Sequence, residues 1–321
     1  MDSAKSSKNI LILGGAGFLG ANLARRCLKE PGVNITLVDS LDPAFKSNKE
    51  NISGILDRVK FIQGDIRDDE LLKGVIPGKN IIFNCAAQTS HPLSLANPIF
   101  DAEINCIGHL KVLQTIRDFN PGAIVIFPST STLVGKAIND VIDENHPERP
   151  LDIYSANKGV GEKYYYIFHK VFGVKSVILR FANLFGPFGK TDPAFGFLNY
   201  FIGLTVQGKP LTIYGDGAQT RNVMFVDDAT DIMWLAANDE KLIGEPYFAA
   251  HYEHYSVREI AETIAEIFRG KTEFIPWPDL RKRIDVDKVK ISSERLYSLT
   301  GWKPKYSLKE GLEITKQRMK S

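Results

Sequence analysis

A glycine-rich turn between an apolar run and a helical pattern constrains this chain more than any other feature. The apolar residues 10–13 are followed at once by Gly14, Gly17 and Gly20. In a strand–turn–helix unit, the first glycine permits a tight turn, the second lets the backbone approach a pyrophosphate, and the third allows close helix–strand packing. The amides at the start of the helix then face the phosphates. The spacing of three and three residues, rather than two and three, is a variant of this pattern, and it predicts a dinucleotide-binding site.

The alternation of strand and helix patterns continues through the first half of the chain. Short apolar runs are typical of buried strands, and amphipathic stretches lie between several of them. Near-continuous apolar strands separated by helices indicate a parallel sheet that helices cover on both faces. We therefore predict a doubly wound, Rossmann-type α/β fold. The predicted strands are residues 9–13, 34–38, 59–62, 80–83, 123–127 and 175–179, and the predicted helices are residues 18–30, 98–119 and 153–172.

This alternation fades after Arg180, where glycines and prolines become frequent. The 321 residues also exceed the ~250–300 residues at which a single core usually stops growing. We expect a dinucleotide-binding domain over residues 1–181, to which residues 223–250 return. A smaller, irregular α/β lobe that binds the substrate would contain residues 182–222 and 251–321.

The charge of the chain is nearly balanced, with 40 basic and 38 acidic side chains and a net charge of +2. This balance does not indicate nucleic acid or an anionic membrane surface as a partner. No apolar run approaches the ~18 residues of a membrane-spanning helix, and residues 1–8 are polar overall. We therefore expect a cytoplasmic protein without a membrane span or a secretory signal.

The cysteines and histidines show no spacing that is typical of a disulfide framework or a metal site. Cys27, Cys85 and Cys106 lie in apolar segments, so we expect buried thiols in a reducing compartment. We interpret the scattered histidines as surface or packing residues rather than metal ligands; they include His91, His146, His169, His251 and His254.

Two acidic residues end predicted strands next to the glycine turn. Asp39 closes the second strand, where a carboxylate can accept hydrogen bonds from a ribose diol but repels a 2′-phosphate. This position favours NAD over NADP, although a helix or turn cap is the alternative role of Asp39. Asp65 ends the third strand, where its carboxylate or the neighbouring backbone could meet the adenine amine. A simple turn residue is a serious alternative for Asp65.

The pair Tyr154 and Lys158 is the clearest catalytic candidate. Residues four apart lie on the same face of a helix. A tyrosine phenol titrates near pH ~10 and is a poor base at neutral pH unless positive charge stabilises the phenolate. Lys158 and an oxidised nicotinamide would supply that charge. Such a pair alone is more often a solvated one, but the dinucleotide signature in the same chain favours the catalytic interpretation.

The order of further motifs adds a resemblance that covers nearly the whole chain. Segments that match a known pattern in order are residues 84–88, 105–108, 128–132, 179–187, 211–217, 219–223 and 226–228. With the glycine turn, Tyr154 and Lys158, these segments resemble the extended short-chain dehydrogenase/reductase family, in its NAD-dependent epimerase/dehydratase branch, whose members act on nucleotide sugars. The match is highly specific for the family and much less so for a substrate.

The resemblance implies roles for individual residues. Thr130 stands where the family places its catalytic serine or threonine, with Tyr154 as the acid/base and Lys158 on the nicotinamide ribose and the tyrosine. Asn183 and Arg221 match contacts to the nucleotide diphosphate, since a guanidinium can grip a pyrophosphate bidentately. The cofactor contacts implied in this way are Gly14, Gly17, Phe18, Leu19, Gly20, Asp39, Asp65, Ile66, Ala86, Asn105 and Lys158.

Three further implications concern partners and the substrate base. We expect a nucleotide-sugar substrate, with a UDP-sugar favoured. Tyr214 could stack on the base, although packing within its own lobe is an equally good interpretation. Relatives form dimers through the helices that correspond to residues 98–119 and 153–172, so we expect a homodimer, although plain core packing would also explain the aromatic residues there.

Two departures from the family pattern bear on the reaction. Leu133-Val134-Gly135 stands where many relatives have Val-Tyr-Gly, which leaves the wall of the sugar pocket open to question. Relatives that dehydrate or decarboxylate the sugar usually have acidic residues at the positions of Ser131 and Thr132, which counts against those activities here. We expect an NAD-dependent epimerase that inverts C4 of a UDP-hexose of the glucose/galactose type through a transient 4-keto intermediate. A 4,6-dehydratase, a 4-keto-sugar reductase, a CDP-sugar 2-epimerase and a non-catalytic NAD-binding regulator are the alternatives.

Overall fold

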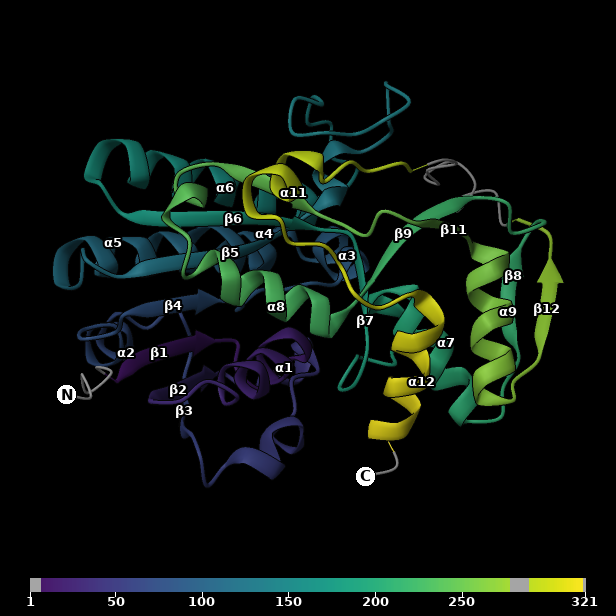
Figure 1. Ribbon diagram of the computed structural model, residues 1–321, viewed down its shortest axis with the longest axis horizontal. Helices are drawn as coiled ribbons and strands as arrows, with labels where there is room; N and C mark the ends of the chain where they lie inside the picture. The colour runs from purple at the N-terminus through teal and green to yellow at the C-terminus, as the bar shows by residue number, and fades with distance from the viewer. Residues whose placement is uncertain (1–6, 278–288, 320–321) are drawn as a thin grey trace.

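Seven parallel strands form the central sheet of the computed structural model, which describes residues 7–277 and 289–319 (Figure 1). The order β10-β6-β5-β4-β1-β2-β3 reverses direction between β1 and β4. All its strand pairs are parallel, which confirms the doubly wound α/β fold. The strands are β1 (Lys8–Leu13), β2 (Val33–Asp39), β3 (Lys60–Gln63), β4 (Ile81–Asn84), β5 (Ile124–Thr130), β6 (Lys175–Phe181) and β10 (Pro246–Ala249).

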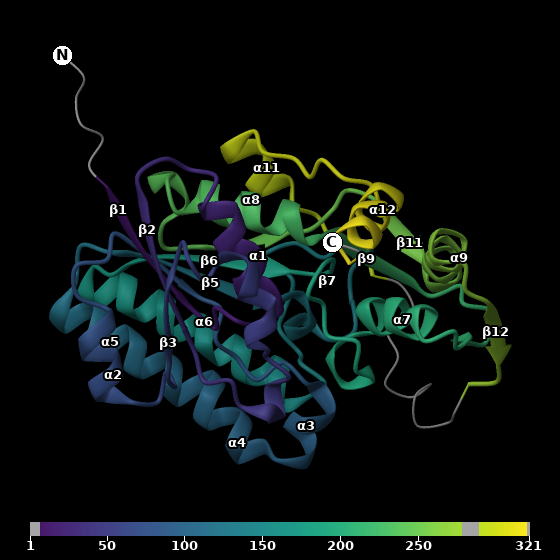
Figure 2. The same ribbon diagram turned by 90° about the horizontal axis from the view of Figure 1, so that it is seen from below.

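Helices cover both faces of this sheet (Figure 2). Alternate residues of β1 point to opposite faces, as a pleated strand requires. Ile10 and Ile12 pack into the core beneath α1 and α8, whereas Leu11 and Leu13 pack into the core beneath α2, α5 and α6. The helices of this part are α1 (Phe18–Cys27), α2 (Asp69–Val75), α3 (His91–Ala96), α4 (Pro98–Ala102), the π-helical segment η3 (Glu103–Gly108), α5 (His109–Phe119), α6 (Ile153–Phe172) and α8 (Val226–Ala236).

Local signals set the ends of α6 at the residues that the sequence predicts. Asp152 precedes the helix, and its side chain accepts a hydrogen bond from the amide of Ser155. Gly173 follows the helix with a φ of 72°, a left-handed conformation that costs glycine little. The predicted helix over residues 98–119 is interrupted by the π-helical turn η3, and the predicted helix over residues 18–30 ends earlier, at Cys27.

The second lobe contains a three-stranded sheet in the order β11-β9-β7 and a two-stranded sheet of β12 and β8. Its own apolar core includes Phe185, Phe201, Ile213 and Ile260. The strands are β7 (Asn183–Phe185), β8 (Leu211–Tyr214), β9 (Thr220–Phe225), β11 (His254–Ser256) and β12 (Thr272–Ile275), and the helices are α7 (Phe197–Val206), α9 (Val257–Phe268) and α12 (Leu308–Arg318).

Two segments of the second half return to the large sheet. Helix α8 packs against α1, and β10 pairs with β6. Helix α11 (Glu294–Thr300) lies beside β10, where the hydroxyl of Tyr297 donates to the carbonyl of Ala250 at 2.5 Å. Part of the segment 251–321 therefore belongs with the large sheet, which differs from the division expected from sequence.

Short 3-10 turns complete the described elements. They are η1 (Pro43–Phe45), η2 (Lys49–Ile55), η4 (Ser131–Val134), η5 (Pro193–Phe195) and η6 (Glu240–Leu242). Within the described part of the chain, no helix combines the length and the apolar character that crossing a membrane requires.

Candidate active site

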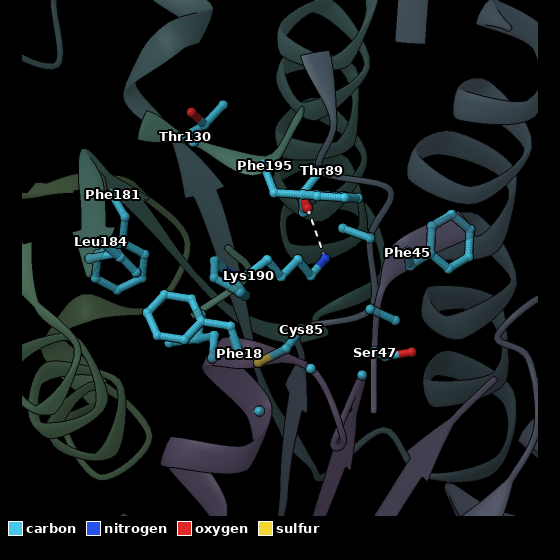
Figure 3. Close-up of a pocket in the computed structure, with 18 of the residues that line it drawn as sticks. Phe18, Phe45, Ser47, Cys85, Thr89, Thr130, Phe181, Leu184, Lys190 and Phe195 are labelled. Atoms are coloured by element: carbon cyan, nitrogen blue, oxygen red, sulfur yellow. Dashed lines mark hydrogen bonds between the residues drawn. The ribbon is translucent and has the colours of Figure 1, made fainter. Parts of the chain in front are cut away.

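A cavity of about 310 Å³ lies at the carboxyl ends of the central strands, where the strand order reverses (Figure 3). Ligands of open α/β sheets bind at such a switch point. The turn after β1, the ends of β2 and β5, and the segment after β4 line this central cavity on one side, and the loop after β7 lines it on the other. Of the predicted cofactor residues, Gly14, Gly17, Phe18, Leu19, Gly20, Asp39, Asp65, Ile66, Ala86 and Lys158 line it.

The glycine turn packs closely against neighbouring backbone at Gly14 and Gly20, and it leaves space around Gly17, which lines the cavity. Gly14 has a φ of 73°, and a Cβ atom on Gly20 would lie 2.2 Å from the carbonyl oxygen of Gly14. A Cβ atom on Gly17 would meet only that same oxygen, at 3.3 Å. Gly17 is also the N-cap of α1 and has no side-chain cap, so the first amides of the helix stay available. This cradle fits the pyrophosphate of a dinucleotide.

Asp39 holds a fixed negative charge beside the glycine turn. One of its carboxylate oxygens accepts from the amide of Ala16 at 3.0 Å, and the other accepts from the amide of Leu41 at 2.9 Å. The carboxylate therefore does cap a turn, and it also lines the cavity, where it would meet an adenosine ribose. A 2′-phosphate at this place would be repelled, which fits NAD.

Asp65 is engaged by its neighbour Arg67. The guanidinium of Arg67 lies 2.8 Å from one carboxylate oxygen, and the amide of Arg67 donates to the other at 2.8 Å. Burial opposes ionisation of Asp65, but these hydrogen bonds and the charge of Arg67 outweigh it and lower the pKa of the carboxyl below its ordinary value. Asp65 thus acts as a turn residue and lines the cavity at the same time.

The three predicted catalytic residues come together at the β5 end of the cavity. Thr130 is the last residue of β5, whereas Tyr154 and Lys158 lie in the first two turns of α6. Thr130 lies close enough to Tyr154 for its side chain to lower the pKa of the phenol, although burial outweighs this effect. The Thr130 hydroxyl also lies 2.9 Å from that of Thr132, which in turn lies 2.7 Å from the hydroxyl of Ser155. A short chain of hydroxyls thus runs from the cavity to the start of α6.

Lys158 is held by the backbone in the cofactor-free protein. Its ammonium donates to the carbonyl of Pro128 at 2.7 Å, and burial lowers the pKa of Lys158 to about 7. Burial, followed by the negative charges of Asp152 and Asp101, raises the pKa of Tyr154. These shifts describe the cofactor-free protein, and the activation expected from the sequence depends on Lys158 together with an oxidised nicotinamide.

Three predicted site residues lie away from the cavity lining, as far as the chain is described. Asn105 is buried behind it in the π-helical segment, where its amide donates to the carbonyl of Gln88 at 2.9 Å, so it supports the loop after β4. Tyr214 packs against Trp277, with ring centroids 5.4 Å apart, which matches the packing interpretation. Arg221 lies on β9 and donates to the carbonyl of Thr220 at 2.8 Å.

Asn183 does line the cavity, at the start of β7. Its amide donates to the carbonyl of Asn222 at 2.9 Å, which connects the cavity wall to the neighbouring strand β9. Cys85 also lines the cavity, whereas Cys27 and Cys106 are buried elsewhere, and none of the three is in a disulfide. Burial raises the pKa of each thiol, so these side chains are un-ionised at neutral pH.

Sequence reasoning missed two cavity residues. His91, interpreted from sequence as a surface or packing residue, lines the cavity with its ring edge-on to Tyr154 at 4.8 Å between centroids. Its Nδ1 atom lies 2.7 Å from a carboxylate oxygen of Asp152, 61 residues away in sequence. Lys190, in the loop after β7, extends into the same space (Figure 3). No local spacing connects these residues to Tyr154 or to the glycine turn.

Comparisons with known proteins agree with this geometry. The putative UDP-glucose 4-epimerase of Methanocaldococcus jannaschii is 30% identical over 97% of this chain and 98% of its own length. The human dTDP-D-glucose 4,6-dehydratase is 26% identical over 96% of this chain and 89% of its own length. The crystal structure of the UDP-glucose 4-epimerase of Thermus thermophilus in complex with NAD is 27% identical, with a TM-score of 0.85 over 98% of this chain and 99% of that one.

The match to a family model covers the glycine turn and the predicted catalytic residues together. The model that describes the NAD-dependent epimerase/dehydratase family matches residues 10–250, three quarters of the chain. With the glycine turn, Asp39 and the Thr130–Tyr154–Lys158 set in one cavity, this match leads to one conclusion: the chain belongs to the NAD-dependent epimerase/dehydratase family and uses NAD.

Proposed function

We propose that the protein is a nucleotide-sugar epimerase that inverts C4 of a UDP-hexose, of the glucose or galactose type. The observation that carries the proposal is that Thr130 and Tyr154 line one cavity, which continues to the glycine turn. Both residues can reach one sugar hydroxyl there, next to where a nicotinamide would lie. The curated relative from Methanocaldococcus jannaschii supports the choice of substrate.

In this reaction Tyr154 removes the proton of the C4 hydroxyl, and Thr130 shares a hydrogen bond with the same oxygen. When bound, NAD supplies the hydride acceptor at C4 and then the hydride donor for the opposite face of the 4-keto-sugar. Tyr154 returns the proton to the new hydroxyl, so neither cofactor nor proton is consumed. Lys158 would hold the nicotinamide end of the cofactor.

The side chains around Tyr154 favour an epimerase over enzymes that need a carboxylic acid beside the sugar. Ser131 and Thr132 follow Thr130, and Thr132 is bonded to the hydroxyl of Ser155. The carboxylates among the described lining residues are Asp39 and Asp65, which lie across the sheet at the ends of β2 and β3. Neither is placed to protonate a leaving hydroxyl of a sugar at Tyr154.

One observation favours a 4,6-dehydratase as the second candidate. The pair of His91 and Asp152 lies directly beside the Tyr154 ring, and an imidazole held by a carboxylate can donate a proton to a leaving hydroxyl. The human dTDP-D-glucose 4,6-dehydratase is among the relatives. Hydroxyl residues at 131 and 132 count against this candidate, so we place it second.

The reaction is tested by incubating the purified protein with UDP-glucose or UDP-galactose and following the products by NMR. Interconversion of the two sugars without net change in NADH supports the epimerase. Loss of water identifies a dehydratase, consumption of reduced cofactor identifies a reductase, and turnover of a CDP-sugar alone identifies a 2-epimerase. No turnover over a panel of nucleotide sugars, with NAD still bound, would point to a regulator.

The role of Tyr154 is tested in the same assay. Tyr154→Phe removes the proton-transferring hydroxyl and keeps the ring that packs against His91. The turnover rate should fall by roughly 10²–10⁴-fold, while NAD stays bound. Near-normal turnover in this variant contradicts the catalytic assignment.

We also propose that the protein forms a homodimer through α6. This helix exposes Val160, Ile167 and Val171, which are spaced seven and four residues apart and lie on one face. An apolar helix face of this kind is commonly covered by a partner. Light scattering coupled to size exclusion should give twice the 35.8 kDa mass of one chain, and a monomeric mass would contradict the proposal.

A further inference from the structure

A single lysine extends across the central cavity from the side opposite the glycine turn. Lys190 belongs to the loop after β7, and its side chain runs between the walls of the cavity (Figure 3). The ammonium lies 3.3 Å from the hydroxyl of Thr89 and 4.2 Å from the centroid of the Phe195 ring. These are weak partners for a full positive charge, because a hydroxyl and an aromatic face leave most of it uncompensated.

Within the described residues, no carboxylate lies at ion-pair distance from this ammonium. Burial lowers the pKa of Lys190 to about 8, and the charge of Asp39 opposes that shift without forming a contact. Taking a cation out of water without a counter-ion is costly. A lysine that the fold holds in a ligand cavity under these conditions is suited to an anion that arrives with the ligand.

The surroundings of the ammonium favour the glycine-turn side of the cavity. Its hydroxyl partner Thr89 follows β4, a neighbour of β1, and the charge of Asp39, at the end of β2 on the other side of β1, acts on it. Strand β1 ends at Leu13 and leads into Gly14 and the turn to α1, which lines the same cavity as Lys190. The uncapped first amides of α1 approach the same space from below.

The loop that carries Lys190 is fixed to the helix that forms this cradle. The side-chain amide of Asn22, in α1, donates to the carbonyl of Pro187 at 2.9 Å. The guanidinium of Arg25, one turn along α1, lies 4.3 Å from the ring centroid of Phe188. Helix α1 and the segment around Pro187 are thus joined, and together they present amides and an ammonium to one volume.

We propose that Lys190 binds the diphosphate of NAD from the side opposite α1, so that the loop after β7 clamps the cofactor in the cavity. The arrangement explains why a weakly compensated ammonium is held beside Thr89 in the cavity. The diphosphate of a nucleotide sugar has the same chemistry. The contact with Thr89, which follows the strand next to β1, favours the cofactor.

The test compares NAD binding by the wild type and by Lys190→Met, which keeps the length of the side chain and removes its charge. Isothermal titration with NAD should show a dissociation constant about 10–100-fold higher for the variant, as expected for one lost charge-assisted hydrogen bond. Lys190→Arg should recover part of the loss. Lys209→Met, at an exposed turn of the same lobe, is the matched control and should bind NAD like the wild type.

The pH dependence of the affinity for NAD is a second measurement, and a lysine with only a structural role would not affect it. Because the free ammonium has its pKa at about 8, the ratio of wild-type to variant affinity for NAD should be constant well below that pH and fall above it. Asp39, Asp65, Lys158 and His91 also line the cavity but are unchanged in the variant, so the difference between the two proteins isolates Lys190. The profile of Lys190→Met should lack the fall that Lys190 causes.

The second part of the test measures the binding of UDP-glucose to the wild type and to Lys190→Met, both loaded with NAD. Unchanged NAD affinity with weaker binding of the nucleotide sugar would overturn the assignment to the cofactor, and unchanged binding of both would overturn the role altogether. Circular dichroism and the melting temperature of the NAD-free proteins identify a folding defect. If Lys190→Met has such a defect, the NAD affinity of Lys190→Arg decides between the outcomes. The NAD arm uses no turnover, so it is independent of the proposed epimerase reaction.

Discussion

Replacing Gly20 by alanine tests whether close packing of α1 on the glycine turn creates the cofactor cradle. The new Cβ atom would lie 2.2 Å from the carbonyl oxygen of Gly14 and 2.9 Å from the Cα atom of Gly15. Normal contact needs a separation larger by about 1 Å. Both neighbours are backbone atoms, so no side chain can rotate away to make room.

Gly14 cannot retreat to absorb this overlap. It lies against the backbone of Cys85 and Ala86, so closely that a Cβ atom on Gly14 would be 2.7 Å from either residue. Helix α1 would have to move outward by about 1 Å instead, carrying its free amides with it. We expect the free energy of unfolding to drop by about 1–3 kcal/mol, as for other overpacked sites. NAD affinity should fall by about 10–100-fold, because the amides no longer reach the pyrophosphate.

Gly74→Ala is the matched control. Gly74 also lies in a helix, α2, but a Cβ atom there would have no heavy atom within 4 Å. Alanine at this position should leave NAD binding unchanged and add about 0.4–1 kcal/mol of stability by restricting the unfolded chain. Isothermal titration measures NAD affinity, and urea unfolding of the NAD-free proteins measures stability. The reasoning is refuted if Gly20→Ala binds NAD as tightly as Gly74→Ala does.

Three further predictions follow from the same structure. Asp39→Asn keeps a side-chain oxygen that can accept from the amide of Ala16 and removes the negative charge. The preference for NAD over NADP should therefore shrink by about tenfold or more. Titration of the variant and the wild type with both cofactors measures this preference. Arg180→Met removes the cation that lies 2.6 Å from Glu162 and 2.8 Å from Glu148; the side chains of Arg180 and Glu162 are each only 4% exposed. In urea unfolding, this variant should lose about 3–5 kcal/mol of the free energy of unfolding. A loss below about 1 kcal/mol would contradict the argument that the ion pair is buried. Lys158 is un-ionised in the folded protein above its pKa of about 7 but stays protonated in the unfolded chain up to its ordinary pKa of 10.5. The unfolded state therefore binds the extra proton, and this lysine makes stability rise with pH across that window. Between pH 7 and 9 the wild type should therefore gain up to about 2 kcal/mol relative to Lys158→Met in urea unfolding, and parallel pH profiles for the two proteins would contradict the low pKa.

The large sheet and its helices could be predicted because their signals are local. A strand that helices cover on both faces must be apolar along its length, and β1, β2 and β4 show this in their own sequences. The bounds of α6 follow from Asp152 before the helix and Gly173 after it. The glycine turn could be assigned for the same reason, since its chemistry is contained within seven residues.

Other features depend on contacts between distant segments. Helix α11 returns to β10 because Tyr297 and Ser293 bond to Ala250, and no periodicity of the helix itself indicates that partner. Asn105 has the residue type that the family pattern implies, yet its amide is turned toward Gln88 and Asp101 behind the cavity. The direction of a side chain depends on its packing environment, which sequence spacing does not specify.

The sequence by itself determined the doubly wound sheet, the place of the dinucleotide at its glycine turn and the residues Thr130, Tyr154 and Lys158 as candidates. The sheet and the turn follow from short-range patterns of hydrophobicity and backbone freedom, Tyr154 and Lys158 follow from their helical spacing, and Thr130 follows from the family resemblance. Only the tertiary structure decided that His91 meets Asp152 beside the tyrosine and that Lys190 meets Thr89 in the cavity, 101 residues away in sequence. Those contacts arise when loops of different strands converge at one edge of the sheet, and the path of a loop is set by what it packs against.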